Sequence, residues 1–403
     1  MSALLLVRPV FTALRSHKTA VTLLVLEIAL TMAILGNLIF IIQGGLGRAH
    51  TATGASESQL GVIQSVTVMG AQSAGTVAGN LNVLRAVPNV KSAAYGGAPL
   101  WYAERDPLFL DPSRQHPIAQ VYEFQGSQGF SRTLGLRIVQ GHDFNDDEIP
   151  VMGKMDEHTV FPVLITLALA NRLFAGGQAL GKIVYDGNAS ARIIGIVDHL
   201  RAEITGRVDD DYAMVIQYRI GAQDMGGSFL INAPAQYLAE ALKAAAAALQ
   251  QANPGHVQVK ALTMAEQRKK YFGSDIAAGR MLIAIILILL AVTALGVTGL
   301  AGFWVQQRTR QIGMRRALGA TRGDILRYFQ IENLLIVSGG ILLGVVFAYA
   351  LNLFLMHRFE LPQLPATYLA AGAITLWVLG QLAVLGPALR AAAVSPVVAT
   401  RSV

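Results

Sequence analysis

Four long apolar runs constrain the fold of this 403-residue chain more than any other feature of its sequence. They lie at residues 20–42, 281–305, 334–356 and 368–389. A helix that crosses a lipid bilayer needs about 20 mostly apolar residues, and each run reaches that length. Charged residues make up only 14% of the chain, against about 25% in soluble domains. We therefore expect four membrane-spanning helices.

The segment 44–275, between the first and second runs, has the pattern of a folded domain. Short strand-like runs bounded by Gly, Asp, Asn and Pro recur at 65–69, 118–124, 162–166, 191–197, 213–218, 228–232 and 256–262. Helical stretches separate them at 71–87, 167–174 and 235–252. A capping box, Thr263-x-x-Glu266, starts a polar helix that leads to the second run. We therefore expect a mixed α+β domain of two lobes.

These patterns predict a membrane protein with four transmembrane α-helices in a one-plus-three arrangement and a large α+β extracytoplasmic domain between the first and second spans. Residues 1–43 are expected to hold an interfacial helix at 2–16, against which Pro9 argues, and the first span. Residues 276–403 are expected to hold three spans and a cytoplasmic coupling segment at 307–330.

The distribution of charge predicts the orientation. Residues 44–275 carry 19 Lys and Arg against 21 Asp and Glu, whereas the rest of the chain carries 13 against 4. The basic excess therefore flanks the apolar runs, and short basic flanks stay on the cytoplasmic side. Both termini and the 307–330 segment are then inside, and 44–275 is outside. Nucleic-acid binding would need a basic face on a folded domain, and this pattern disfavours it.

The segment between the second and third runs is the most distinctive part of the chain. It carries six arginines: Arg308, Arg310, Arg315, Arg316, Arg322 and Arg327. Residues 309–318 have helical composition, and Gly319 suits the position just after a helix end. Thr321-x-x-Asp324 is a capping box that starts a new helix. The sequence thus predicts a short helix, a glycine elbow and a capped helix, with apolar groups among the arginines as in a docking surface.

Glu27 and Asn37 are polar residues inside the first predicted span. An ionisable group within a span costs a few kcal/mol unless it is paired. One interpretation is a contact between Glu27 and a neighbouring helix or subunit, through Asn37, Asn352 or Gln381. The alternative is that Glu27 reaches the inner interface or is protonated. The sequence leaves both open.

Other motifs favour structural readings over catalysis. The run 176–183 is close to a phosphate-binding loop, but Ile183 stands where that loop needs a hydroxyl, so we expect a turn between a helix and a strand. The acidic run 143–148 starts like a calcium loop but has Glu148 where glycine is needed. The chain has no cysteine, and its eight histidines have no metal-ligand spacing. We expect no catalytic residues, no metal site and no cofactor bound by this chain.

The basic segment and its surroundings resemble the MacB/FtsX family of ABC-transporter permeases. The resemblance is carried by Arg310-Gln311-Ile312-Gly313-Met314-Arg315-Arg316-Ala317-Leu318-Gly319-Ala320 with Asp324-Ile325 and Glu332, by Gly386-Pro387-Ala388-Leu389-Arg390 with Ser395-Pro396, and by Gly141-His142-Asp143-Phe144 with Asn171-Arg172-Leu173-Phe174. It covers essentially the whole chain. It implies a MacB-like extracytoplasmic domain, an FtsX-like transmembrane region and a permease without a fused ATPase domain.

The resemblance also implies a mechanism called mechanotransmission, in which a separate ATPase pair closes on ATP beneath the basic segment and the movement passes into the extracytoplasmic domain. The residues expected to couple to that ATPase are Arg310, Ile312, Arg315, Arg316, Leu318, Gly319, Ala320 and Asp324, with Glu332 anchoring the third span. The implied partners are a cytoplasmic ABC ATPase dimer carrying ATP and Mg²⁺, a second permease subunit, membrane lipid and a periplasmic membrane-fusion protein.

Three functions fit these observations. The first is a permease in the bacterial inner membrane that exports peptides, antibiotics or other amphiphiles. The second is an FtsX-like regulator of cell-wall hydrolases, for which the domain at 44–275 is large. The third is a four-span sensor without an ATPase, which predicts that no ATPase binds at 308–330.

Overall fold

The computed structural model describes residues 18–67, 74–101, 105–151, 159–187, 189–219, 227–253, 257–359 and 363–394. The helix predicted at 2–16 and the Ser395-Pro396 pair lie outside these residues. The chain divides into two compact units. The sheet domain is Gly47–Ser274, and the helical unit comprises the chain before and after it.

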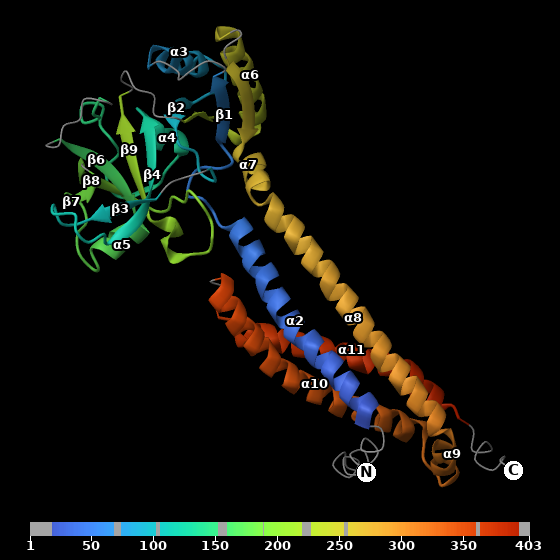
Figure 1. The fold of residues 1–403 in the computed structure, drawn as a ribbon. Coiled ribbons are helices and arrows are strands. Elements are labelled where there is room, and N and C mark those ends of the chain that lie inside the picture. Colours follow the sequence, from blue (N-terminus) through green and yellow to red (C-terminus); the bar gives the residue numbers. More distant parts are fainter. Residues whose placement is uncertain are drawn as a thin grey trace. The chain divides into compact units, whose positions relative to one another are not determined.

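Among the residues that the structure describes, the helical unit contains four helices that are long and apolar enough to cross a membrane. They are α2 (Lys18–His50), α8 (Gly273–Gln307), α10 (Arg322–Phe359) and α11 (Ala366–Ala392), with the short α9 (Thr309–Ala317) between α8 and α10. Figure 1 shows α9 next to the C-terminal end of α8. Each predicted span lies within one of these helices, so the four-span prediction is confirmed.

Small residues bring α2 and α10 close together. A Cβ atom added to Gly340 would lie 2.6 Å from Cγ2 of Ile28, and one added to Gly344 would lie 2.5 Å from Cβ of Met32. Such close backbone approach strengthens packing between helices in lipid, where the hydrophobic effect offers little. Leu24, Ile28 and Met32 are buried in the same core as residues of the other three spans.

The sheet domain has an open lobe and a barrel lobe (Figure 1). In the open lobe the strand order is β11 (Val257–Thr263), β1 (Leu60–Thr67), β10 (Ser228–Asn232) and β2 (Ser92–Gly96), with every neighbouring pair antiparallel. Helices α3 (Ala74–Arg85) and α6 (Leu238–Ala252) pack on this sheet through an apolar cluster that includes Val77, Leu81 and Leu242.

The barrel lobe is a sheet that closes on itself. Its strands run in the order β4 (Ala119–Ser127), β3 (Arg105–Phe109), β7 (Ile183–Asp186), β8 (Ala189–Val197), β6 (Val160–Thr166) and β9 (Ala213–Tyr218), and β9 pairs back with β4. β5 (Ile138–Gly141) pairs with β8, and the helices of this lobe are α4 (Phe130–Leu134) and α5 (Leu167–Leu173). Val121, Val163 and Val184 lie in its apolar core.

The two lobes share a narrow strand contact. β2 and β4 pair at one register position, Gly96 opposite Gly126, and the Tyr95 amide donates to Oγ of Ser127 at 2.9 Å. A Cβ on Gly126 would lie 2.1 Å from the Phe130 ring, so only glycine fits there. A third cluster, which includes Phe130 and Leu230, packs elements of both lobes together.

Acidic side chains also face the inside of the barrel at one end. Glu123 shares the inward face of β4 with Val121, and Asp186 shares that of β7 with Val184, because side chains alternate along a strand. Burial, and next the neighbouring Asp186 carboxyl, raise the pKa of Glu123 to about 9. Gln125 donates to Glu123 at 2.9 Å. The carboxyl of Glu123 is therefore protonated at neutral pH.

The turn expected at 176–183 is present. α5 ends at Leu173, Gly176 and Gly181 have positive φ angles of 74° and 76°, and β7 starts at Ile183. The α+β prediction for the sheet domain is confirmed. The strand after the turn is β7, as expected, whereas the strand-like patterns did not predict the short strands β2, β3 and β5 or the helix α4.

Candidate functional site

The basic segment between the second and third spans folds as an elbow, which comprises the end of α8, α9, Gly319 and the start of α10 up to Glu332. α9 ends at Ala317, and Gly319 follows with φ of 100°. The amide of Gly319 donates to the Arg316 carbonyl and that of Ala320 to the Arg315 carbonyl, both at 3.1 Å. This pair of bonds is the Schellman arrangement, which satisfies carbonyls left open at a helix end and requires a left-handed residue. The predicted role of Gly319 as a helix stop is thus confirmed.

The next helix begins with the predicted capping box. Oγ1 of Thr321 accepts from the Asp324 amide at 3.2 Å, and the Asp324 carboxylate accepts from the Thr321 amide at 3.0 Å and from its hydroxyl at 2.6 Å. A carboxylate in the first turn also complements the positive end of the helix dipole. The start of α10 is therefore fixed immediately after the elbow.

A buried ion pair links the end of α8 to α10. Nη1 of Arg308 donates to Oε1 and Oε2 of Glu332 at 2.9 and 3.0 Å. The side chains are 12% and 1% exposed. The Arg308 guanidinium lies 5.6 Å from the centre of the Trp304 ring. Glu332 thus anchors the third span, and Arg308 is the partner that the sequence did not reveal.

Two further arginines of α9 make contacts within the helical unit. Nη1 of Arg316 donates to the carbonyls of Ala392 and Val394, at 2.8 and 2.9 Å, where α11 ends. The Arg315 guanidinium lies 4.9 Å from the centre of the Tyr328 ring. Because the last carbonyls of a helix lack partners within it, Arg316 caps α11 and ties it to α9.

The elbow has an apolar inner side and an exposed outer side. Ile312, Ile325 and Phe329 are buried in one cluster with the end of α11, beside a small cavity of about 80 Å³. On the outer side Leu318 is 85% exposed and Met314 is 52% exposed. Exposed apolar side chains among charges are common in interaction sites.

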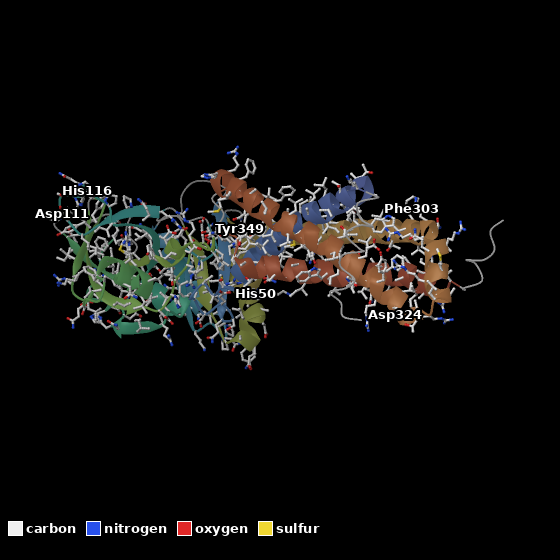
Figure 2. All side chains as sticks on the ribbon, turned by 90° about the horizontal axis from the view of Figure 1, so that it is seen from below. His50, Asp111, His116, Phe303, Asp324 and Tyr349 are labelled. Carbon is white, nitrogen blue, oxygen red and sulfur yellow. The ribbon has the colours of Figure 1, made fainter. Side chains whose placement is uncertain are left out.

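The predicted coupling residues therefore fall into three groups by burial. Arg310, Arg315, Leu318, Gly319 and Asp324 are exposed. Ile312 and Glu332 are buried, and Arg316 and Ala320 are half-buried. The structure brings all of them into one elbow, and Figure 2 labels Asp324 at one end of the helical unit.

The polar residues of the first span do not meet in the way considered from the sequence. The carboxylate of Glu27 lies against Gly296 of α8, where a Cβ would be 2.7 Å from Oε2. Asn37 donates to the carbonyls of Ala33 and Ala348 at 2.9 and 3.2 Å. Asn352 accepts from the Leu364 amide, and Gln381 donates to the Gln330 carbonyl.

A second polar cluster holds together the segments by which the chain enters and leaves the sheet domain. Arg268 of α7 (Met264–Tyr271) donates to Glu57 through Nε at 2.9 Å and Nη2 at 2.5 Å, and to the Ala49 carbonyl at 3.0 Å. Burial alone would raise the pKa of Glu57, but the hydrogen bonds from Arg268 and Thr53 outweigh it and hold that pKa below its usual value. We call this group the Arg268 clamp.

The comparisons with known proteins agree with this architecture. Residues 283–396, which include the elbow, match the family model of the FtsX-like permease C-terminal domain. The macrolide export ATP-binding/permease protein MacB of Chromobacterium violaceum is 26% identical over 228 residues, which is 55% of this chain and 34% of that protein. The ABC transporter permease YknZ of Bacillus subtilis is 27% identical over 282 residues, 68% of each chain.

Among solved structures, the periplasmic region of MacB from Actinobacillus actinomycetemcomitans matches 56% of this chain and 97% of that one, at 13% identity and a TM-score of 0.37. The chain spans about a third of the length of the MacB relative and about two thirds of that of YknZ. Residues 283–396 therefore match an FtsX-like permease C-terminal domain, and the chain is similar to the ABC transporter permeases MacB and YknZ.

Proposed function

We propose that this chain is the membrane subunit of an ABC exporter that works by mechanotransmission. An ABC ATPase, which carries the ATP and Mg²⁺, docks in the cytoplasm on the solvent-exposed side of the elbow. Its closure moves α8 and α10, and that movement is passed to the sheet domain outside the membrane. The substrate class is peptides, antibiotics or other amphiphiles, as the macrolide export named for the MacB relative suggests.

The observation that carries the proposal is the way the elbow is fastened. Arg308 pairs with Glu332, Arg316 caps α11, and Gly319 fixes the angle between α9 and α10. Because the elbow is bonded to three spans, a movement of the elbow also displaces those spans. A loop that only sets the orientation of the chain in the membrane would not need these contacts, whereas a segment that binds a partner does.

The surroundings of the elbow suit this role. The basic flanks favour a cytoplasmic elbow in the bacterial inner membrane, with both termini inside and the sheet domain outside. Arg310 and Arg315 are exposed beside Met314 and Leu318, which suits an acidic and apolar groove on the ATPase. A second permease subunit and a periplasmic membrane-fusion protein complete the proposed assembly.

Co-purification with the ATPase tests the proposal. Met314→Asp combined with Leu318→Asp should reduce ATPase association at least tenfold, because both side chains lose apolar contact with the partner. The matched control is Val208→Asp, which places the same charge at a side chain of the sheet domain that is 84% exposed. The control should leave association unchanged.

Both variants should insert into the membrane as the wild type does, since no buried contact is altered. Equal ATPase association for the double variant and the wild type would overturn the assignment of the docking surface. No ATPase association by the wild type itself would favour the four-span sensor.

A further inference from the structure

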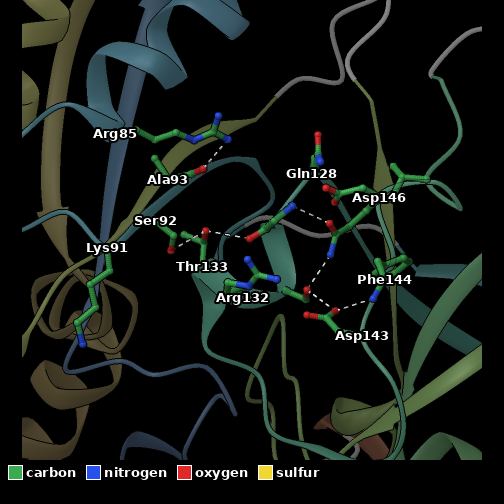
Figure 3. Close-up of a pocket in the computed structure, with 14 residues that line it drawn as sticks. Arg85, Lys91, Ser92, Ala93, Gln128, Arg132, Thr133, Asp143, Phe144 and Asp146 are labelled. Atoms are coloured by element: carbon green, nitrogen blue, oxygen red, sulfur yellow. Dashed lines mark hydrogen bonds between the residues drawn. The ribbon is translucent and has the colours of Figure 1, made fainter.

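A polar cavity of about 440 Å³ lies between the two lobes of the sheet domain (Figure 3). One wall comes from the end of α3 and the start of β2, in the open lobe. The other comes from α4, the loop after β5 and strand β9, in the barrel lobe. The volume falls in the range of about 300–1,000 Å³ typical of small-molecule sites, which often form between domains.

The floor of the cavity is held in place by hydrogen bonds. Gln217 of β9 accepts from the Gly129 amide at 2.8 Å and donates to Oγ of Ser131 at 2.7 Å. Ser131 in turn donates to Oδ1 of Asp143 at 2.7 Å. The side chains of Gln217 and Ser131 are buried. The floor is therefore pre-formed, which lowers the cost of binding.

The charges in the walls are arranged by sign. Figure 3 shows Arg85 and Lys91 on one side, Asp143 and Asp146 on the other, and Arg132 between them. Among the residues that the structure describes, Arg85, Lys91 and Arg132 form no ion pair. Arg85 donates to the Ala93 carbonyl at 3.2 Å, which leaves the charge of its guanidinium unneutralised.

We propose that this cavity binds a small zwitterion, namely an amino acid or short peptide with free termini. Its carboxylate faces the cations, led by Arg132, and its ammonium group faces Asp146 and Asp143. Bidentate pairing with arginine suits a carboxylate. An uncharged amphiphile would leave both sets of charges without partners, and a simple anion would leave the two carboxylates repelling it.

The cavity lies where the two lobes meet. The lobes are joined there by the β2–β4 pairing and by a shared apolar cluster, and a ligand that contacts Arg85 on one wall and Asp146 on the other would add to these contacts. The proposal concerns the sheet domain alone and needs no ATPase. If the cavity does not bind a zwitterion, the proposed exporter function still stands. If no ATPase binds the elbow, the cavity proposal still stands.

The test is isothermal titration of the full-length chain in lipid nanodiscs with tri-alanine, its N-acetylated form and its C-terminal amide. Tri-alanine should bind at least tenfold more tightly than either blocked peptide. Arg132→Gln should weaken tri-alanine binding at least tenfold but leave binding of the amide unchanged. Asp146→Asn should weaken tri-alanine but leave the N-acetylated peptide unchanged.

The control variant is Arg137→Gln, whose side chain is 75% exposed, pairs with Asp198 and does not line the cavity. It should bind tri-alanine as the wild type does. Equal binding of the free and blocked peptides, or binding of inorganic phosphate as tight as that of tri-alanine, would overturn the zwitterion assignment. Absence of measurable heat with all three peptides would also overturn it.

Discussion

Arg308 and Glu332 form a charged pair that links α8 to α10 within the helical unit. Removing a single partner of a buried pair costs about 3–5 kcal/mol, because the remaining charge is left unpaired. Replacing both by apolar residues of similar size is often neutral. Glu332 is 1% exposed and Arg308 is 12% exposed, so loss of Arg308 leaves the more deeply buried of the two charges in place.

We therefore predict that Arg308→Met destabilises the helical unit more than Glu332→Met, and that the double variant recovers most of the loss. The measurement is a double-mutant cycle on unfolding in detergent. Arg310→Met is the control, since Arg310 is an exposed arginine of α9. Additive losses in the double variant would contradict the prediction.

Glu123 sets a pH dependence for the barrel lobe. Its pKa is about 9 in the folded chain, against an ordinary value of 4.5. Between these values the folded state binds a proton that the unfolded state does not. Stability from this group is thus full below about pH 4.5 and is lost as pH rises through 9, by up to about 1.4 kcal/mol per pH unit.

The melting temperature of the sheet domain, measured by circular dichroism, should fall as the pH rises from 5 to 9. Glu123→Gln should flatten this slope, because an amide fills the site without a proton to lose. Glu148→Gln changes an exposed carboxylate and should leave the slope as it is. A slope unaltered by Glu123→Gln would contradict the assignment.

At this scale the sequence was most informative where the chemistry is local. The Thr321–Asp324 box needs residues three apart and could be read directly. The contact of Glu27 with Gly296 could not, because glycine has no side chain to mark it. Asn37 was a poor partner for Glu27, since ten residues place them about 15 Å apart along one helix.

At the scale of elements, the elbow depends on the conformation of Gly319. A residue with a side chain at φ of 100° is strained, and left-handed geometry costs roughly 1–2 kcal/mol outside glycine. No neighbouring atom lies within 4 Å of a Cβ added there. The cost of substitution is therefore conformational and not steric.

We predict that Gly319→Ala weakens ATPase association and lowers the melting temperature of the helical unit. Gly319→Asn should be milder, because asparagine tolerates left-handed geometry. Gly323→Ala is the matched control in the first turn of α10, where alanine favours the helix. An equal effect of alanine at both positions would show that Gly319 is not held in a left-handed conformation.

The elements that the sequence predicted best are those with strong apolar patterning. β9 and β10 start and end at the residues expected, because every side chain in them is buried. β5 was missed because three of its four residues are exposed and its pairing with β8 is set by the distant chain. The closure of β9 onto β4 likewise depends on topology, which composition does not record.

At the scale of the whole molecule, the Arg268 clamp joins the segments by which the chain enters and leaves the sheet domain, and under the proposed mechanism motion reaches the domain through it. Glu57 and Arg268 are 211 residues apart in sequence, and the clamp also holds the Ala49 carbonyl near the end of α2. A bidentate carboxylate–arginine pair is both stronger and more directional than a single contact.

Arg268→Gln should therefore raise amide hydrogen exchange at residues 49–57 and lower the ATP-dependent movement of the sheet domain. The barrel lobe should keep its exchange protection. Lys270→Gln, an exposed position on the same helix, serves as the control. The clamp would not be a transmission point if Arg268→Gln left exchange at 49–57 as in the wild type.

The closed barrel has a consequence for how such a chain survives outside the cytoplasm. Unpaired strand edges are templates for aggregation. The ladder from β4 to β9 leaves no free edge at its ends, because β9 pairs with β4. The chain also has no cysteine. The barrel lobe thus closes its own strand ladder without help from a disulfide, and reducing conditions should leave the solubility of the sheet domain unchanged.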